Sequence, residues 1–172
     1  MRIFFSVVMN LINRVVKLYR QWRVLRTVKS HKGRVFIGGI THLSSNTILN
    51  ENPNFNGMVI KGGGQVTFGN NFHSGSDCLI ITQIHNYDKG KSIPYDNTYI
   101  YKDVLIGDNV WFGDRVIVLG GVKIGEGAII QAGSVVVRDI PDLGIAGGSP
   151  AIVFKYRDKE HYFDLKKMRC FH

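Results

Sequence analysis

The stretch VLIGDNVWFGDRVIVLGGVKIGEGAIIQAGSVVV, residues 104–137, repeats a pattern of six residues. A bulky apolar residue leads each hexad, and a small or β-branched residue follows four positions later. The leading positions are Ile100, Ile106, Phe112, Val118, Ile124, Ile130 and Val136, and the second positions are Val104, Val110, Val116, Val122, Ala128, Ser134 and Ile140. A period of six is too short for a helical repeat and is typical of a parallel β-helix, in which each hexad forms one short strand and a turn.

The repeat therefore predicts an all-β solenoid whose leading apolar side chains point inward and stack from coil to coil. Glycine follows several leading positions, as at Gly107, Gly113 and Gly125, and permits a positive φ at the corners. A fainter copy of the pattern runs upstream, in a shifted frame, from Phe68 to Ile84.

The interval between Ile80 and Ile100 is not a multiple of six, so an insertion is predicted there. It contains TQIHNYDKGKSIPYDN, residues 82–97, in which Gly90, Pro94 and Asn97 are turn-forming residues. We expect a loop extruded from the solenoid near residues 86–99. A loop of this length in a compact domain is usually functional or disordered.

The composition limits the number of domains, the kinds of partner and the kinds of site that the chain can have. A chain of 172 residues is long enough for one domain with a real core. Its 22 Lys+Arg against 13 Asp+Glu give a formal charge of +9, which favours anionic partners. Nucleic acid is not predicted, because no nucleic-acid motif is present and the basic residues concentrate at the two ends. Cys78 and Cys170 are far apart in the sequence and predict neither a disulfide framework nor a zinc site, so a reducing cytoplasm fits best.

The two ends differ from the repeat. Residues 1–30 predict an amphipathic helix with an apolar stripe of Phe4, Val8, Leu11, Val15, Leu18, Trp22 and Leu25. The stripe favours packing on the protein or on a neighbouring subunit, and peripheral contact of residues 2–28 with an anionic membrane is the alternative. The apolar run is too short to span a bilayer. Residues 31–155 are assigned to the β-helix, and residues 156–172 to a short helical tail that caps its open end.

The residues VLIGDNVWFGDRVIVLGGVKIGEGAIIQAGSVVVRDIP, followed by IAGGSPAIVFK, resemble the left-handed parallel β-helix acyltransferases of the hexapeptide-repeat superfamily. The similarity is greatest to galactoside, maltose, xenobiotic and polysaccharide O-acetyltransferases. The resemblance implies a left-handed coil, a homotrimer, and acetyl-CoA bound in the groove between neighbouring β-helices. It implies no metal.

The resemblance also implies roles for single residues. His85, at the start of the insertion and upstream of Trp111, stands where the family has its general base. Gly113 and Asp114 match residues at the thiol end of the donor, and Ala132 matches one beside its pantetheine arm. Arg138 and Lys155 match cations that meet the donor phosphates, Trp111 matches an aromatic residue at the edge of the site, and Asn86 is a candidate acceptor residue.

A neutral imidazole can take the proton of a sugar hydroxyl near pH 7, so the residue type suits this reaction. A zinc site built on His73 and His85 would lack a third histidine between residues 86 and 160. We therefore predict a cytoplasmic, acetyl-CoA-dependent O-acetyltransferase that acts on a sugar or polysaccharide, peripheral to the inner membrane face if the first helix binds lipid. The alternatives are an N-acetyltransferase acting on an amino sugar and a non-catalytic β-helical scaffold.

Overall fold

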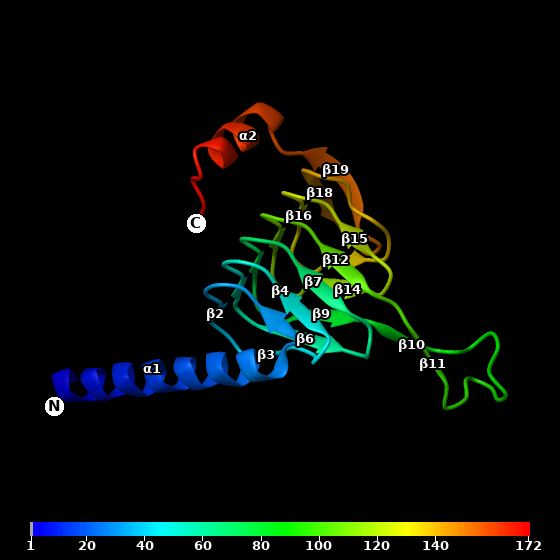
Figure 1. The fold of residues 1–172 in the computed structure, drawn as a ribbon, viewed down its shortest axis with the longest axis horizontal. Helices are drawn as coiled ribbons and strands as arrows, with labels where there is room; N and C mark the ends of the chain where they lie inside the picture. The colour runs from blue at the N-terminus through cyan, green and yellow to red at the C-terminus, as the bar shows by residue number, and fades with distance from the viewer. Residues whose placement is uncertain (1) are drawn as a thin grey trace.

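The computed structural model describes the backbone of residues 2–172, and within the first helix it describes the side chains of all residues except those at positions 2–4 and 7. Met1, which the predicted N-terminal segment includes, and the side chain of Phe4 lie outside the described residues. The chain forms a parallel β-helix between an N-terminal helix, α1 (Arg2–Thr27), and a short C-terminal helix, α2 (Lys159–Lys167) (Figure 1). The predicted fold class is confirmed.

Three sheets run along the coil stack and form its sides. Their strands pair in parallel, one coil to the next, except that the last strand, β19, is antiparallel to β18. Sheet A contains β1 (Ser30–His31), β4 (Thr47–Leu49), β7 (Val66–Phe68), β12 (Val104–Ile106) and β15 (Lys123–Ile124). Sheet B contains β2 (Phe36–Ile37), β5 (Asn54–Phe55), β8 (His73–Ser74), β13 (Trp111–Phe112), β16 (Ile129–Ile130), β18 (Gly144–Gly147) and β19 (Ile152–Tyr156). Sheet C contains β3 (Thr41–His42), β6 (Met58–Lys61), β9 (Cys78–Ile81), β14 (Ile117–Leu119) and β17 (Val135–Val136).

The hexads set the register of the later coils. Leu105 lies beside Lys123, and Trp111 beside Ile129, so one coil there consists of three hexads. Both apolar positions of the hexads between residues 104 and 140 are buried, with exposed fractions of 3% or less. Upstream the coil length varies: Thr41 pairs with Met58, slightly less than three hexads away, and Met58 pairs with Cys78, slightly more than three hexads away. This variation explains why the upstream repeat has no clean phase in the sequence.

The insertion forms a hairpin. Val104 pairs with Val66, although the chain between them is about twice as long as a regular coil of three hexads. The additional residues form β10 (Gln83–His85), β11 (Tyr99–Tyr101) and the loop between them, which extends away from the coils (Figure 1). The prediction that Ile100 leads an inward-pointing hexad is wrong, as is the inclusion of Ile84. These two residues are 40% and 45% exposed, because they pair with each other in the hairpin and lie outside the coil.

Side-chain carboxylates close the corners between the sheets. Five aspartates each accept a hydrogen bond from a backbone N–H of the preceding coil, and this bond satisfies a donor that no strand pairs. The pairs are Asp103 with Gln65 (2.7 Å), Asp108 with Asn70 (2.7 Å), Asp114 with Ser76 (2.6 Å), Asp139 with Lys123 (2.7 Å) and Asp142 with Glu126 (2.9 Å).

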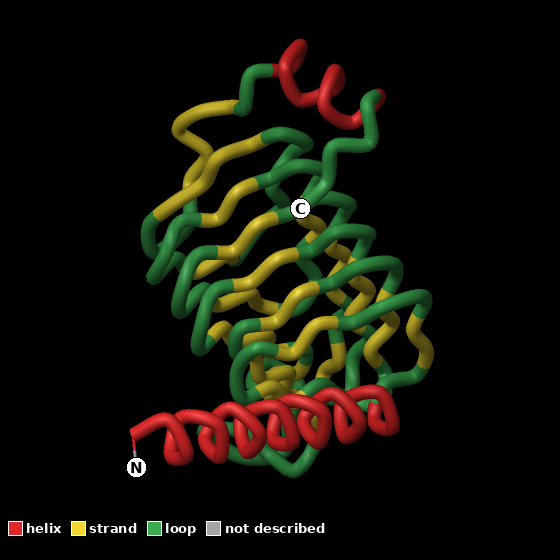
Figure 2. The backbone as a smooth tube through the Cα atoms, turned by 90° about the vertical axis from the view of Figure 1, so that its left-hand side faces the viewer, coloured by secondary structure: helices red, strands yellow, loops and turns green. Residues whose placement is uncertain are grey.

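The two helices occupy different places. The last turns of α1 cover the N-terminal end of the stack, where Val24 is buried against the core and Leu25 and Val28 pack on it (Figure 2). The predicted capping of the other end by α2 is not what the contacts show. Tyr162 and Lys166 of α2 bond to residues of earlier coils at the corner between sheets A and B, so α2 lies along the side of the stack. Among residues 2–172, the helices are too short or too polar to cross a bilayer.

Four phenylalanine rings stack through the interior. Phe72 is fully buried, and its ring centroid lies 4.6 Å from that of Phe68 and 5.1 Å from that of Phe112. Phe72→Ala would leave a cavity between two coils, so we expect the free energy of unfolding to fall by about 3–5 kcal/mol. Denaturant unfolding at fixed protein concentration measures this change. Ile93→Ala, at a side chain that is 99% exposed, is the control and should shift stability by less than about 0.5 kcal/mol.

Candidate functional site

His85 is the last residue of β10 and lies opposite Tyr99 in the hairpin. Its ring stacks on Tyr95 from the loop, with centroids 3.6 Å apart and planes inclined by 19°. The Tyr99 ring lies 4.6 Å away on a tilted plane. Two aromatic neighbours on separate parts of the hairpin thus restrict the rotation of the imidazole, which orients its nitrogens.

The two ring nitrogens of His85 differ in their surroundings. Nδ1 is buried and has no hydrogen-bond partner among the described residues. Nε2, in contrast, is not among the buried side-chain atoms that lack a hydrogen-bond partner. A buried nitrogen without a hydrogen-bond partner costs free energy. Nε2 is then the nitrogen that a substrate can reach.

Polar side chains order the loop beyond His85. The Asn86 amide donates to the Thr98 hydroxyl (3.2 Å), and its oxygen accepts from the Lys89 N–H (3.2 Å). Asp96 accepts from the backbone N–H groups of Lys91 and Thr98, both at 2.8 Å, and from the Thr98 hydroxyl, whose hydrogen bond lowers the pKa of the carboxyl most. Both ends of the Asn86 side chain are therefore used within the loop.

A groove of about 280 Å³ begins at the root of the hairpin. Its lining is mostly apolar and comes from three successive coils: Ile81, Thr82, Gln83, Ile84, Ile100, Lys102, Leu119, Gly120 and Val137. Arg138 follows Val137 and is exposed. The groove thus leads along the corner between sheets C and A from the hairpin to a cation.

Gly113, Asp114 and Ala132 meet at the opposite edge of sheet C, at the corner with sheet B. A Cβ atom on Gly113 would lie 2.6 Å from the Ala132 nitrogen, so only glycine fits there. Asp114 binds the Ser76 N–H, and Ala132 is exposed. The structure brings these three predicted donor residues together and gives Asp114 a role in closing the corner.

The chain does not bring that corner close to its own histidine. Between the corner at residues 75–77 and the start of β10 runs β9, which at about 3.3 Å per residue separates them by roughly 13 Å. Trp111 and Lys155 lie on sheet B, on β13 and β19. The predicted site residues therefore fall into three groups on one chain.

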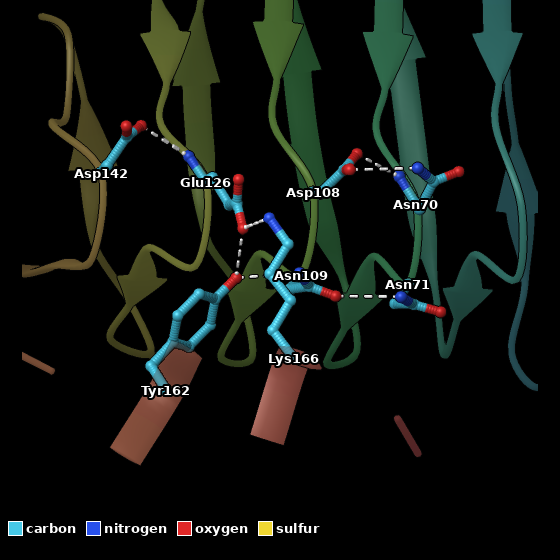
Figure 3. A network of polar contacts seen from close by, with 8 residues as sticks. All are labelled: Asn70, Asn71, Asp108, Asn109, Glu126, Asp142, Tyr162 and Lys166. Carbon is cyan, nitrogen blue, oxygen red and sulfur yellow. Dashed lines mark hydrogen bonds and ion pairs between the residues drawn. The ribbon is translucent and has the colours of Figure 1, made fainter. Parts of the chain in front are cut away.

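Trp111, which is 52% exposed, lines a second cavity, of about 440 Å³, between sheet B and α2. A hydrogen-bonded chain fixes α2 beside this cavity (Figure 3): Asn71 donates to Asn109 (2.9 Å), Asn109 to Tyr162 (2.8 Å) and Tyr162 to Glu126 (2.9 Å). Lys166 forms an ion pair with the same Glu126 carboxylate. Burial raises the pKa of Tyr162, so its hydroxyl remains a donor.

The two thiols differ in reactivity. Cys78 is buried, its Sγ lies 3.3 Å from the Gly113 carbonyl oxygen, and burial raises the pKa of its thiol to about 11. Cys170 is exposed. Because the thiolate is the reactive species, we expect a disulfide reagent at pH 8 to modify one thiol per chain rapidly, and the second only after unfolding. Cys170→Ser should remove the rapid phase; a rapid phase that persists in this variant contradicts the assignment.

Within the described part of the chain, no three His, Cys, Asp or Glu side chains are grouped as metal ligands would be. The sequence predicts His85 and the glycine-bearing corner as site residues, and these assignments stay predictions. Sequence reasoning missed Tyr95 and Tyr99, which pack on the imidazole, and the role of Asp114, although the recurring Gly-Asp pairs at residues 107–108 and 113–114 were a visible signal.

Comparison with known proteins places this geometry among characterised folds. The family model described as "Bacterial transferase hexapeptide (six repeats)" matches residues 96–138. A Schizosaccharomyces pombe protein named "Putative acetyltransferase" is 38% identical over 113 residues, which are 64% of this chain and 50% of that protein. The hexapeptide repeats at residues 96–138 are thus similar to those of bacterial transferases, and this relative is an acetyltransferase by name.

The chain spans about half the length of the curated relatives it matches. A hexapeptide-repeat acetyltransferase from Vibrio cholerae has a similar structure, with a TM-score of 0.60 and 25% identity over 81% of this chain and 78% of that one. The structure of its complex with acetyl-CoA is similar too, with a TM-score of 0.52 and 25% identity over 75% of this chain and 72% of that one. A maltose O-acetyltransferase from Clostridium difficile, with a TM-score of 0.67 over 87% and 88% of the chains, is 24% identical and shows the fold alone.

Proposed function

We propose that this hexapeptide-repeat protein is a homotrimeric acetyltransferase that transfers the acetyl group of acetyl-CoA to a sugar or polysaccharide hydroxyl. The observation that carries the proposal is His85, whose ring packs against two tyrosines where the loop begins in the only hairpin of residues 2–172 that interrupts the coils. Relatives that are named acetyltransferases, one of them in complex with acetyl-CoA, support the donor.

His85 acts as the general base in this proposal. Nε2 takes the proton of the acceptor hydroxyl while the hydroxyl oxygen attacks the thioester carbon. The tetrahedral intermediate then collapses, the carbon–sulfur bond breaks, and the imidazolium returns the proton to the departing thiolate. Backbone N–H groups at the glycine-bearing corner are suitable donors to the oxyanion. Atoms and charges balance without a metal or a covalent enzyme intermediate.

The donor lies across sheet C in this arrangement. Gly113 and Ala132 mark one edge of the sheet and Arg138 the other, separated in the last coil by the short strand β17. A thioester at the first edge and phosphates at the second would place the reacting carbon near Gly113. Lys155, on sheet B, remains a further candidate for the phosphates, and Trp111 a candidate for the edge of the site.

The separation within one chain then requires a second subunit. Reacting atoms must approach to about 3–3.5 Å, whereas the corner and the hairpin root of one chain are separated by the length of β9. We place His85 of one subunit against the Gly113–Ala132 corner of its neighbour, as a cyclic trimer with head-to-tail contacts allows.

An acceptor screen tests the proposed activity. The protein is incubated with acetyl-CoA and a panel of neutral sugars, amino sugars and oligosaccharides, and products are identified by mass spectrometry. We expect an acetyl ester that mild alkali removes. A product stable to alkali, formed only with amino sugars, would assign N-acetylation instead, and the absence of any product above the rate of His85→Ala would favour a scaffold.

A further inference from the structure

Helix α1 carries a broad apolar face. Ten large apolar side chains between residues 5 and 22 are exposed: Phe5, Val8, Met9, Leu11, Ile12, Val15, Val16, Leu18, Tyr19 and Trp22. At about 100° per residue they fill one continuous half of the helix circumference. The polar residues of the same segment fill the other half: Ser6, Asn10, Asn13, Arg14, Lys17, Arg20 and Gln21.

This apolar half faces away from the coils. Among the described side chains of α1 and the turn after it, those that pack on the solenoid lie near the C-terminal end of the helix, where Val24 is 2% exposed and Val28 is partly buried against the core. On the helical wheel these two side chains point roughly 150–170° away from the centre of the apolar half. Figures 1 and 2 show α1 crossing the N-terminal end of the stack. Since the side that carries Val24 meets the coils, the helical wheel directs the apolar half out beyond that end.

The charge around this face has one sign. Residues 1–50 contain no Asp or Glu, whereas α1 contains Arg2, Arg14, Lys17, Arg20, Arg23 and Arg26. Arg14 and Arg20 lie at the two borders of the apolar half, on opposite sides of it. Long basic side chains in such positions can reach outward past an apolar surface to anionic groups.

We propose that α1 is a docking surface for an anionic membrane, with its apolar half at the boundary between headgroups and acyl chains. An apolar half bordered by cations is complementary to acidic headgroups above acyl chains. A second copy of α1 is a poorer occupant, because it brings the same cations and no acidic residue. The helix lies in the plane of the membrane, and the coil stack rises from it. This inference rests on α1 alone and does not depend on the proposed acetyl transfer.

Co-sedimentation of the full chain with lipid vesicles tests the proposal. Vesicles of equal parts phosphatidylglycerol and phosphatidylcholine should bind the wild type at least tenfold more tightly than pure phosphatidylcholine, and added salt should weaken the binding. Leu11→Glu with Val15→Glu places two charges on the apolar half, at side chains that are 62% and 57% exposed, and should reduce binding to the mixed vesicles more than tenfold.

The matched control is Asn10→Glu with Asn13→Glu, which adds the same charge to the polar half and should reduce binding no more than about threefold. Thermal unfolding and analytical ultracentrifugation of both variants check fold and assembly. The proposal is overturned if the wild type does not bind the mixed vesicles, or if the two double variants lose binding equally. It is also overturned if Leu11→Glu with Val15→Glu dissociates the oligomer, since the face would then be a subunit interface.

Discussion

Replacing His85 with alanine should lower the turnover number for acetyl transfer by about 10²–10⁴-fold, the usual contribution of a general base. Without the imidazole, the acceptor hydroxyl must lose its proton to water as it attacks the thioester. The Michaelis constant for acetyl-CoA should change little, because His85 is not among the residues assigned to donor binding. Release of the CoA thiol in the presence of an acceptor measures both quantities.

His161→Ala is the control for this experiment, because His161 is an exposed histidine on α2, outside the residues assigned to the reaction. It should keep the wild-type turnover. Turnover of His85→Ala within threefold of the wild type would assign the proton transfer to another group. Unchanged thermal unfolding of His85→Ala is needed as well, because the ring packs on Tyr95 and Tyr99.

The later coils could be predicted from the sequence because the two apolar positions of every hexad there are buried in the core. From Val104 to Ile140 the apolar residues at both hexad positions point into the core, and the coil length stays at three hexads until β17. A strict period therefore maps directly onto a strict register. Ile84 and Ile100 misled the prediction because their spacing and residue types fit the period, while the hairpin exposes them.

Two features of the ends depend on tertiary packing. The amphipathic pattern of α1 predicts a helix, but the turn after Thr27 decides which side meets the coils, and Val24 is buried there. The tail residues predict a helix at 159–167, whereas its position follows from the bonds of Tyr162 and Lys166 with Glu126. The residues near each helix in the sequence do not indicate which part of the coil stack that helix contacts.

The candidate site was predictable in part. His85 is marked by its place at the start of the insertion, and Gly113 by its place in the repeat. Tyr95 lies well beyond His85 in an irregular loop, so its stacking on the imidazole depends on the path that Asn86 and Asp96 impose on the chain. The distance between His85 and the donor corner follows only from the folded sheet.

Because that distance places the two halves of the site on different subunits, mixing two inactive variants should restore activity. Ala132→Tyr adds a bulky side chain at an exposed corner position and should block the donor while leaving the fold intact. His85→Ala removes the base. If each site combines the histidine of one subunit with the corner of the next, mixed trimers contain some sites in which both contributions are native.

Random assortment of equal amounts of the two chains makes such a site whenever the histidine comes from the Ala132→Tyr chain and the corner from the His85→Ala chain. About one site in four meets both conditions in a head-to-tail ring. The mixture should therefore regain about a quarter of the wild-type activity, although each variant alone is nearly inactive. Denaturation and joint refolding, or co-expression with two affinity tags, produces the mixed trimers.

The activity of these mixed assemblies shows whether each active site is shared between two subunits. Turnover should rise from the background of either variant to about a quarter of the wild-type value only after the subunits are exchanged. Mixed assemblies of proven composition that stay at the background rate would contradict a shared site, because His85 and the Gly113–Ala132 corner would then have to act within one chain.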